Sequence, residues 1–125
     1  MAIVTDEQLA LRRRIFEAYA ATGEPPAVPD TDDLRALADA HVVMLGDDAR
    51  IVMAHPFAGH RDGTRVDADG RTWWGNCAWD GFGIVHALGL RDATITAQGH
   101  TAGAPGVVFE VAVPAARWWD DIAHT

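Results

Sequence analysis

The residues best suited to chemistry in this chain are Cys77, its only cysteine, and Asp80, three positions later. Residues three apart on a helix share a face, so a helix capped by Asn76 would direct the thiol and the carboxylate into one space. In its first turn, unpaired backbone N–H groups and the helix dipole favour a thiolate at Cys77. A carboxylate among apolar neighbours such as Trp79 has its pKa raised, and can hold a proton near neutral pH. The spacing therefore predicts a soft nucleophile or metal ligand beside a proton donor.

A structural role is the alternative for Cys77, because most free cysteines in proteins behave as small buried hydrophobic residues. The six histidines show no H-E-x-x-H or other tight ligand spacing, and a hydrogen-bonded structural role is favoured for each. His86 lies about two and a half helical turns beyond Cys77, so the two cannot share a metal ion from one helix. The sequence also lacks a phosphate-binding glycine loop, a G-x-S-x-G motif and a paired-cysteine zinc motif. Chemistry is therefore expected at Cys77 and Asp80.

Composition narrows the class of protein. At 125 residues and 49% hydrophobic content, the chain can form one domain, or one domain with a small subdomain. A net charge of −8, with 10 basic residues against 18 acidic ones, argues against a nucleic-acid partner. The N-terminus has no signal-peptide pattern, and no apolar run approaches the roughly 20 residues that span a bilayer. We expect a cytoplasmic protein with a small-molecule substrate and no membrane partner, and its tryptophan pairs leave a homodimer open.

The first 54 residues have the outline of an abbreviated winged helix. A capping box beginning at Thr5 predicts a helix that ends at Gly23 before a proline-rich turn. Thr31 can cap a second, short helix. Two strands joined by a turn follow within residues 42–53. We therefore assign residues 1–54 to a winged-helix-like subdomain with two helices instead of the usual three.

Residues 55–125 are assigned to a catalytic core built on a small mixed sheet, which gives an α+β fold overall. A strong hairpin turn at Asp69-Gly70 joins two of its strands. The expected elements are strands at 64–67, 71–74, 93–97 and 107–113, a Cys77-bearing helix that ends near Leu88, and a final helix at 115–121. Adjacent residues of a strand face opposite sides, so one tryptophan of each pair belongs to the core and the other to a pocket wall or interface. We predict an apolar substrate pocket lined by Phe57, Trp74 and Trp79.

Two segments carry a family resemblance. Val52–Phe57, which ends in His-Pro-Phe, and Trp73–Ile84, with Asn-Cys-Ala-Trp-Asp at its centre, resemble the alkylmercury (organomercurial) lyase family. A turn at His100–Pro105 and the closing Trp118–Ile122 extend the resemblance over nearly the whole chain. It implies an alkylmercury-lyase-like fold and protonolysis of a carbon–mercury bond. No cofactor is then required, and Hg(II) or another soft metal is substrate or product.

Positions carried over from that family give each residue a role. The resemblance implies that Cys77 is the thiolate ligand of mercury and that Asp80 is the proton donor and an oxygen ligand. The family also uses a second cysteine, which this sequence lacks, and His124 near its end could offer only a nitrogen ligand. Two alternatives therefore stay open. One is a divergent member that acts on another small organic substrate through the same pair, and the other is a soft-metal-binding protein without turnover.

Overall fold

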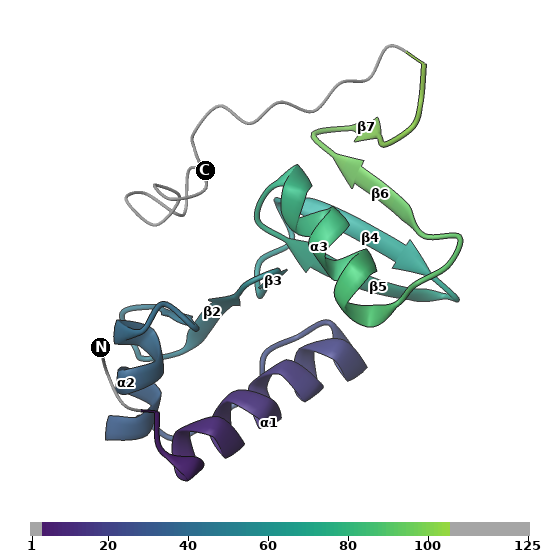
Figure 1. Ribbon diagram of the computed structural model, residues 1–125. Helices are drawn as coiled ribbons and strands as arrows, with labels where there is room; N and C mark the ends of the chain where they lie inside the picture. Colours follow the sequence, from purple (N-terminus) through teal and green to yellow (C-terminus); the bar gives the residue numbers. More distant parts are fainter. Residues whose placement is uncertain (1–3, 106–125) are drawn as a thin grey trace.

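The computed structural model describes residues 4–105, in which three helices accompany two small antiparallel sheets (Figure 1). The α+β class predicted from the sequence is confirmed. The helices and strands, in chain order, are α1 (Asp6–Thr22), α2 (Asp32–Asp39), β1 (Met44–Leu45), β2 (Ile51–Ala54), β3 (Phe57–Ala58), β4 (Thr64–Ala68), β5 (Arg71–Gly75), α3 (Ala78–Leu88), β6 (Thr94–Ala97) and β7 (His100–Thr101).

Local capping signals define the two N-terminal helices. The Thr5 hydroxyl accepts the Gln8 backbone N–H at 3.1 Å, and the Gln8 side chain accepts the Thr5 N–H at 3.2 Å. Helix α1 ends at Gly23, whose φ of 74° is the left-handed conformation that glycine adopts without strain. The Thr31 hydroxyl caps α2 by accepting the Leu34 N–H at 3.3 Å. All three predicted caps are confirmed.

A three-stranded sheet in the order β1-β2-β3 follows the two helices. The predicted hairpin is present as β1 and β2, and β2 also pairs antiparallel with β3, with Ala54 opposite Phe57. This second pairing joins residues on both sides of position 54, where the sequence predicts a domain boundary. The winged-helix description and that boundary stay predictions.

The second sheet has the order β5-β4-β6-β7, and all of its pairs are antiparallel. Its β4–β5 hairpin turns at Asp69 and Gly70, whose φ values of 52° and 73° suit the twist of the flanking strands. The sequence predicts a mixed sheet, which would need at least one parallel pair of strands, and no such pair is present among the described residues. The strand predicted at 107–113 and the helix predicted at 115–121 lie outside the described residues.

Helix α3 packs across this four-stranded sheet (Figure 1). Close approach is possible because Gly81 has no side chain: a Cβ there would lie 2.7 Å from Thr64 Cγ2 and 2.8 Å from Ile95 Cγ2. Helix α1 is tied to β5, whose buried Trp73 donates its indole N–H to the Ala20 carbonyl at 3.0 Å. Within residues 4–105 no helix combines the length and the apolar character needed to cross a membrane.

Candidate active site

The N-terminal end of α3 brings the predicted pair together. The helix begins at Ala78, so Cys77 itself is the N-cap residue, and the prediction that Asn76 would cap the helix is wrong by one position. The reason lies at Asp80, the third residue of the helix. Its Oδ2 accepts the backbone N–H groups of Cys77 and Asn76, each at 3.1 Å. The carboxylate therefore satisfies the backbone N–H groups just before the helix, and these hydrogen bonds fix its start.

Asp80 is buried, with only 5% of its surface exposed. Its second oxygen, Oδ1, lies 3.1 Å from Nδ1 of His55, which precedes Pro56 in a cis peptide bond. The Cβ of Asp80 packs against the bare backbone of β5, because a Cβ at Gly75 would lie 2.7 Å from it. Both oxygens of Asp80 thus have defined partners, as buried polar atoms require.

The thiol of Cys77 is partly buried, and burial is the main reason that its pKa is raised above the ordinary value. The negative charge of Asp80 and a hydrogen bond with its side chain raise this pKa further. Backbone N–H groups of Asp80 and Trp79 act in the opposite direction but do not prevail. The prediction that the helix terminus would favour a thiolate is therefore wrong in its net direction. The raised pKa favours the thiol over the thiolate.

Alkylation tests this raised pKa directly. The rate at which iodoacetamide modifies Cys77 should rise with pH at a higher midpoint than for N-acetylcysteine, because burial and Asp80 both disfavour the thiolate. In Asp80→Asn the midpoint should fall, since the nearby negative charge is removed while burial remains. The measurement is the second-order rate across a pH series. A wild-type midpoint below that of N-acetylcysteine would contradict this account.

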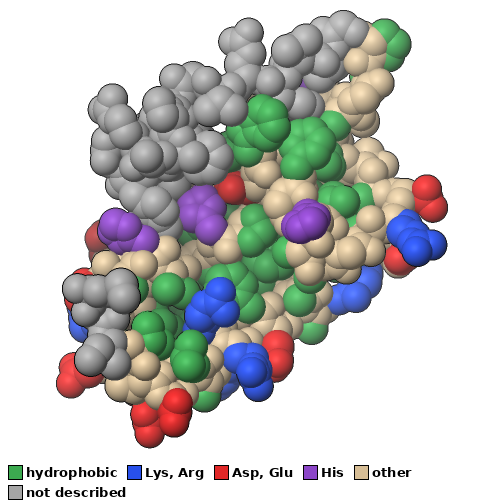
Figure 2. All heavy atoms as spheres, viewed as in Figure 1, with side chains coloured by type: hydrophobic (Ala, Val, Ile, Leu, Met, Phe, Trp, Pro, Cys, Tyr) green, Lys and Arg blue, Asp and Glu red, His purple; other side chains and the backbone are tan. Residues whose placement is uncertain are grey.

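The three predicted pocket residues have different surroundings. Trp79 is 38% exposed and pairs with Phe82, 39% exposed, with ring centroids 5.7 Å apart. Trp74 is partly buried, whereas its neighbour Trp73 is in the core, as the strand alternation predicted. Phe57 is also in the core and stacks on Tyr19 at 5.4 Å. Exposed hydrophobic and histidine side chains lie near one another on the face shown in Figure 2.

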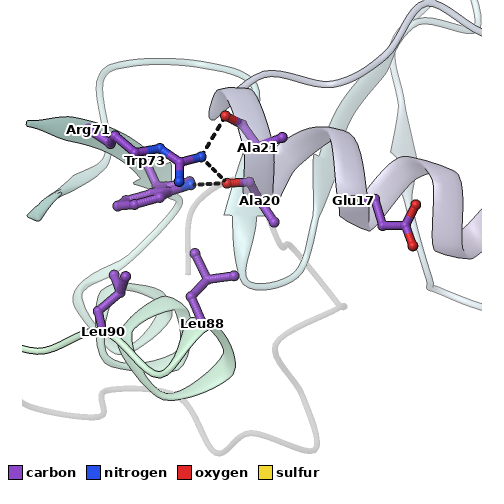
Figure 3. Close-up of a pocket in the computed structure, with 7 residues that line it drawn as sticks. All are labelled: Glu17, Ala20, Ala21, Arg71, Trp73, Leu88 and Leu90. Atoms are coloured by element: carbon purple, nitrogen blue, oxygen red, sulfur yellow. Dashed lines mark hydrogen bonds between the residues drawn. The ribbon is translucent and has the colours of Figure 1, made fainter. Parts of the chain in front are cut away.

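A separate pocket of about 420 Å³ opens between α1, β5 and the end of α3 (Figure 3). Arg71 crosses one wall and donates to the Ala20 and Ala21 carbonyls at 2.9 and 2.6 Å. The lining residues are Glu17, Ala20, Ala21, Arg71, Trp73, Leu88 and Leu90. Neither Cys77 nor Asp80 is among them, so this pocket is distinct from the predicted pair.

Comparison with known protein families shows to which family the chain belongs. The alkylmercury lyase (MerB) family matches residues 57–120, which is just over half of the chain. The chain belongs to the alkylmercury lyase family. Searches of curated proteins and of solved structures returned no match. The matched region includes both Cys77 and Asp80, and the family is one of enzymes.

Among residues 4–105, no three or more His, Cys, Asp or Glu side chains are grouped to hold a metal ion. The predicted role of Cys77 and Asp80 as ligands stays a prediction.

In this alkylmercury lyase family member, the hydrogen-bonded role predicted for the histidines is present at His55 and His60, but their partners were not predicted. His55 contacts Asp80, and Nε2 of His60 lies 3.1 Å from Oδ1 of Asn76. The signal for His55 was its place in the His-Pro-Phe segment directly after a buried strand. No local pattern links His60 to Asn76, because the contact depends on how β3 and β5 pack.

Proposed function

We propose that this protein cleaves the carbon–mercury bond of organomercurials by protonolysis, with Cys77 binding mercury and Asp80 protonating carbon. The observation that carries the proposal is the first turn of α3, where a thiol adjoins a buried carboxylate. Membership of the alkylmercury lyase family supports the same reaction class. The exposed rings of Trp79 and Phe82, on the same helix, offer apolar contacts to the organic group.

In the first step the soft Cys77 sulfur binds the soft mercury of R–Hg–X. The raised pKa keeps a proton on the sulfur, so an S–H bond must break as the S–Hg bond forms. Asp80 is the nearby acceptor, since its carboxylate charge is among the causes of the raised thiol pKa. The products of this step are Cys77–S–Hg–R, a protonated Asp80 and the released anion X⁻.

In the second step Asp80 delivers that proton to the carbon bound to mercury. The electron pair of the Hg–C bond forms the new C–H bond, and the hydrocarbon R–H departs. Hg(II) then stays on the Cys77 sulfur, with the ionised Asp80 carboxylate as an oxygen ligand. One proton has passed from sulfur through oxygen to carbon. The reaction needs no external oxidant or reductant.

A second sulfur must come from another molecule, because the sequence has one cysteine. A small thiol in excess can supply it, weaken the Hg–C bond by donation and remove the Hg(II) product. His124, the predicted nitrogen ligand, lies outside the described residues. We therefore expect turnover to depend on the concentration of added thiol.

Benzene release from phenylmercuric acetate, followed by gas chromatography with excess thiol, tests the proposal. Wild-type protein should turn over, and Cys77→Ser should release no benzene above the uncatalysed rate, because a hydroxyl is a hard, poor mercury ligand. His86→Gln, an exposed position at the other end of α3, is the control and should match wild type. Folded wild-type protein that releases no benzene would refute the proposal. Mercury retained in a 1:1 ratio without benzene would favour the metal-binding alternative.

The nucleophilic alternative receives less support. An enzyme that attacks an organic electrophile through Cys77 needs a thiolate near neutral pH, and the raised pKa of this thiol works against one. Mercury chemistry avoids this difficulty, because metal binding itself displaces the proton.

A further inference from the structure

We infer that His55 is a positioning residue, which orients the Asp80 carboxylate so that one lone pair of Oδ1 faces the reacting atoms. The inference rests on the proposed protonolysis and assigns a role to a residue outside the Cys77–Asp80 pair. It is carried by the hydrogen bonds around Asp80 and by the strand pairing that holds His55.

The two carboxylate oxygens of Asp80 have different partners. Oδ2 accepts the backbone N–H groups of Asn76 and Cys77, so its lone pairs are occupied by donors that cannot leave without unwinding the helix start. Oδ1 is therefore the oxygen available to receive and deliver a proton. His55 Nδ1 lies 3.1 Å from Oδ1, and with the carboxylate ionised its N–H donates to that oxygen.

This donor leaves Oδ1 one further lone pair. A carboxylate oxygen has two such directions, and His55 occupies one of them. Without His55, no donor would hold Oδ1, and the two contacts at Oδ2 would be the hydrogen bonds that limit rotation of the carboxylate about the Cβ–Cγ bond. Proton transfer to carbon requires an oriented donor, and a displacement of about 1 Å can cost about 10²-fold in rate.

The backbone around His55 is itself fixed. His55 and Pro56 form the connection between β2 and β3, where Ala54 pairs with Phe57 and both are buried. The following segment returns to the same helix start, because His60 contacts Asn76. Two histidines, one before and one after β3, thus contact Asp80 and Asn76, which lie on either side of Cys77 in the sequence. Such a rigid support is what an oriented carboxylate requires.

Three substitutions separate positioning from a general structural role. His55→Asn places an amide N–H at the Nδ1 position, His55→Gln places it farther out, and His55→Ala removes it. With phenylmercuric acetate and excess thiol, we expect the Asn variant to keep kcat within about threefold of wild type. The Gln and Ala variants should lose about 10²-fold in kcat with little change in KM, because orientation and not binding is lost.

Amide resonances provide a readout that does not need activity. In ¹H–¹⁵N spectra, the Asn76 and Cys77 amides should shift in His55→Ala and His55→Gln, because both donate to the carboxylate that has turned. They should return close to their wild-type positions in His55→Asn. His86→Gln, in the last turn of α3, should leave both resonances unchanged.

The outcomes distinguish failure of the positioning role of His55 from failure of the proposed protonolysis. Unmoved Asn76 and Cys77 amides in folded His55→Ala, a wild-type kcat in that variant, or no restoration in folded His55→Asn would each overturn the positioning role. If wild-type protein releases no benzene while the amides move in the Ala variant and return in the Asn variant, the protonolysis proposal fails. The structural role of His55 in orienting Asp80 would then stand.

Discussion

Replacing Asp80 by Asn should lower benzene release from phenylmercuric acetate by about 10²- to 10⁴-fold, the range typical for loss of a general acid. An amide cannot take the thiol proton and pass it to carbon. Its oxygen can still accept the Asn76 and Cys77 N–H groups that the carboxylate accepts now. The helix start should therefore survive the substitution, and the loss should report chemistry.

Mercury capture separates the two steps in this variant. Asp80→Asn keeps Cys77, so native mass spectrometry should show one phenylmercury group bound per chain with the phenyl group uncleaved. Asp80→Ala is a poorer probe, because it also leaves two backbone donors at a buried helix start without their acceptor, at about 1–3 kcal/mol. A wild-type rate in folded Asp80→Asn would exclude Asp80 as the proton donor.

Replacing Gly75 by Ala should reduce both stability and activity. The new Cβ would lie 2.7 Å from the Asp80 Cβ and 3.1 Å from the Pro56 carbonyl oxygen, so strand β5 and helix α3 must separate. Overpacking of this kind costs about 1–3 kcal/mol. The displaced carboxylate should also lower benzene release by about 10²-fold, since proton transfer depends on its position.

Gly46→Ala is the matched control for this substitution. Its nearest neighbour in the β1–β2 turn would be the flexible Val52 side chain at 3.3 Å, with Asp48 Oδ1 at 3.5 Å and the Arg50 carbonyl oxygen at 3.7 Å in ordinary contact. Urea unfolding followed by circular dichroism gives the stability of each variant, and benzene release gives its activity. Equal stability and activity in the Gly75 and Gly46 variants would show that α3 does not depend on a bare backbone at Gly75.

Short-range signals were sufficient for most of the fold. The caps at Thr5 and Thr31, the Asp69-Gly70 turn and the end of α3 near Leu88 each depend on a few adjacent residues, and the structure confirms them. The prediction that Cys77 and Asp80 lie close together likewise required only helical periodicity. These features were predictable because the residues that cause them are neighbours in the chain.

Features that depend on distant residues were not predictable in this way. His55 meets Asp80 across 25 positions, through strand pairing that no local pattern specifies. The direction of the Cys77 pKa shift depends on burial, which the helix-dipole argument could not include. Even the cap lies one residue later than predicted, at Cys77, whose backbone N–H the Asp80 carboxylate accepts.

Helix ends ordinarily fray, because their last carbonyl groups have no helical N–H partner. In this protein those of Ala20 and Ala21 are held by Trp73 and Arg71 of strand β5. Fraying of α1 would leave the buried indole N–H without its acceptor, at about 1–3 kcal/mol. Opening of the helix end is thus coupled to opening of β5, which runs into Cys77 through Gly75 and Asn76. The turn that carries Cys77 and Asp80 is thus stabilised in part by α1, a helix that contributes no residue to it.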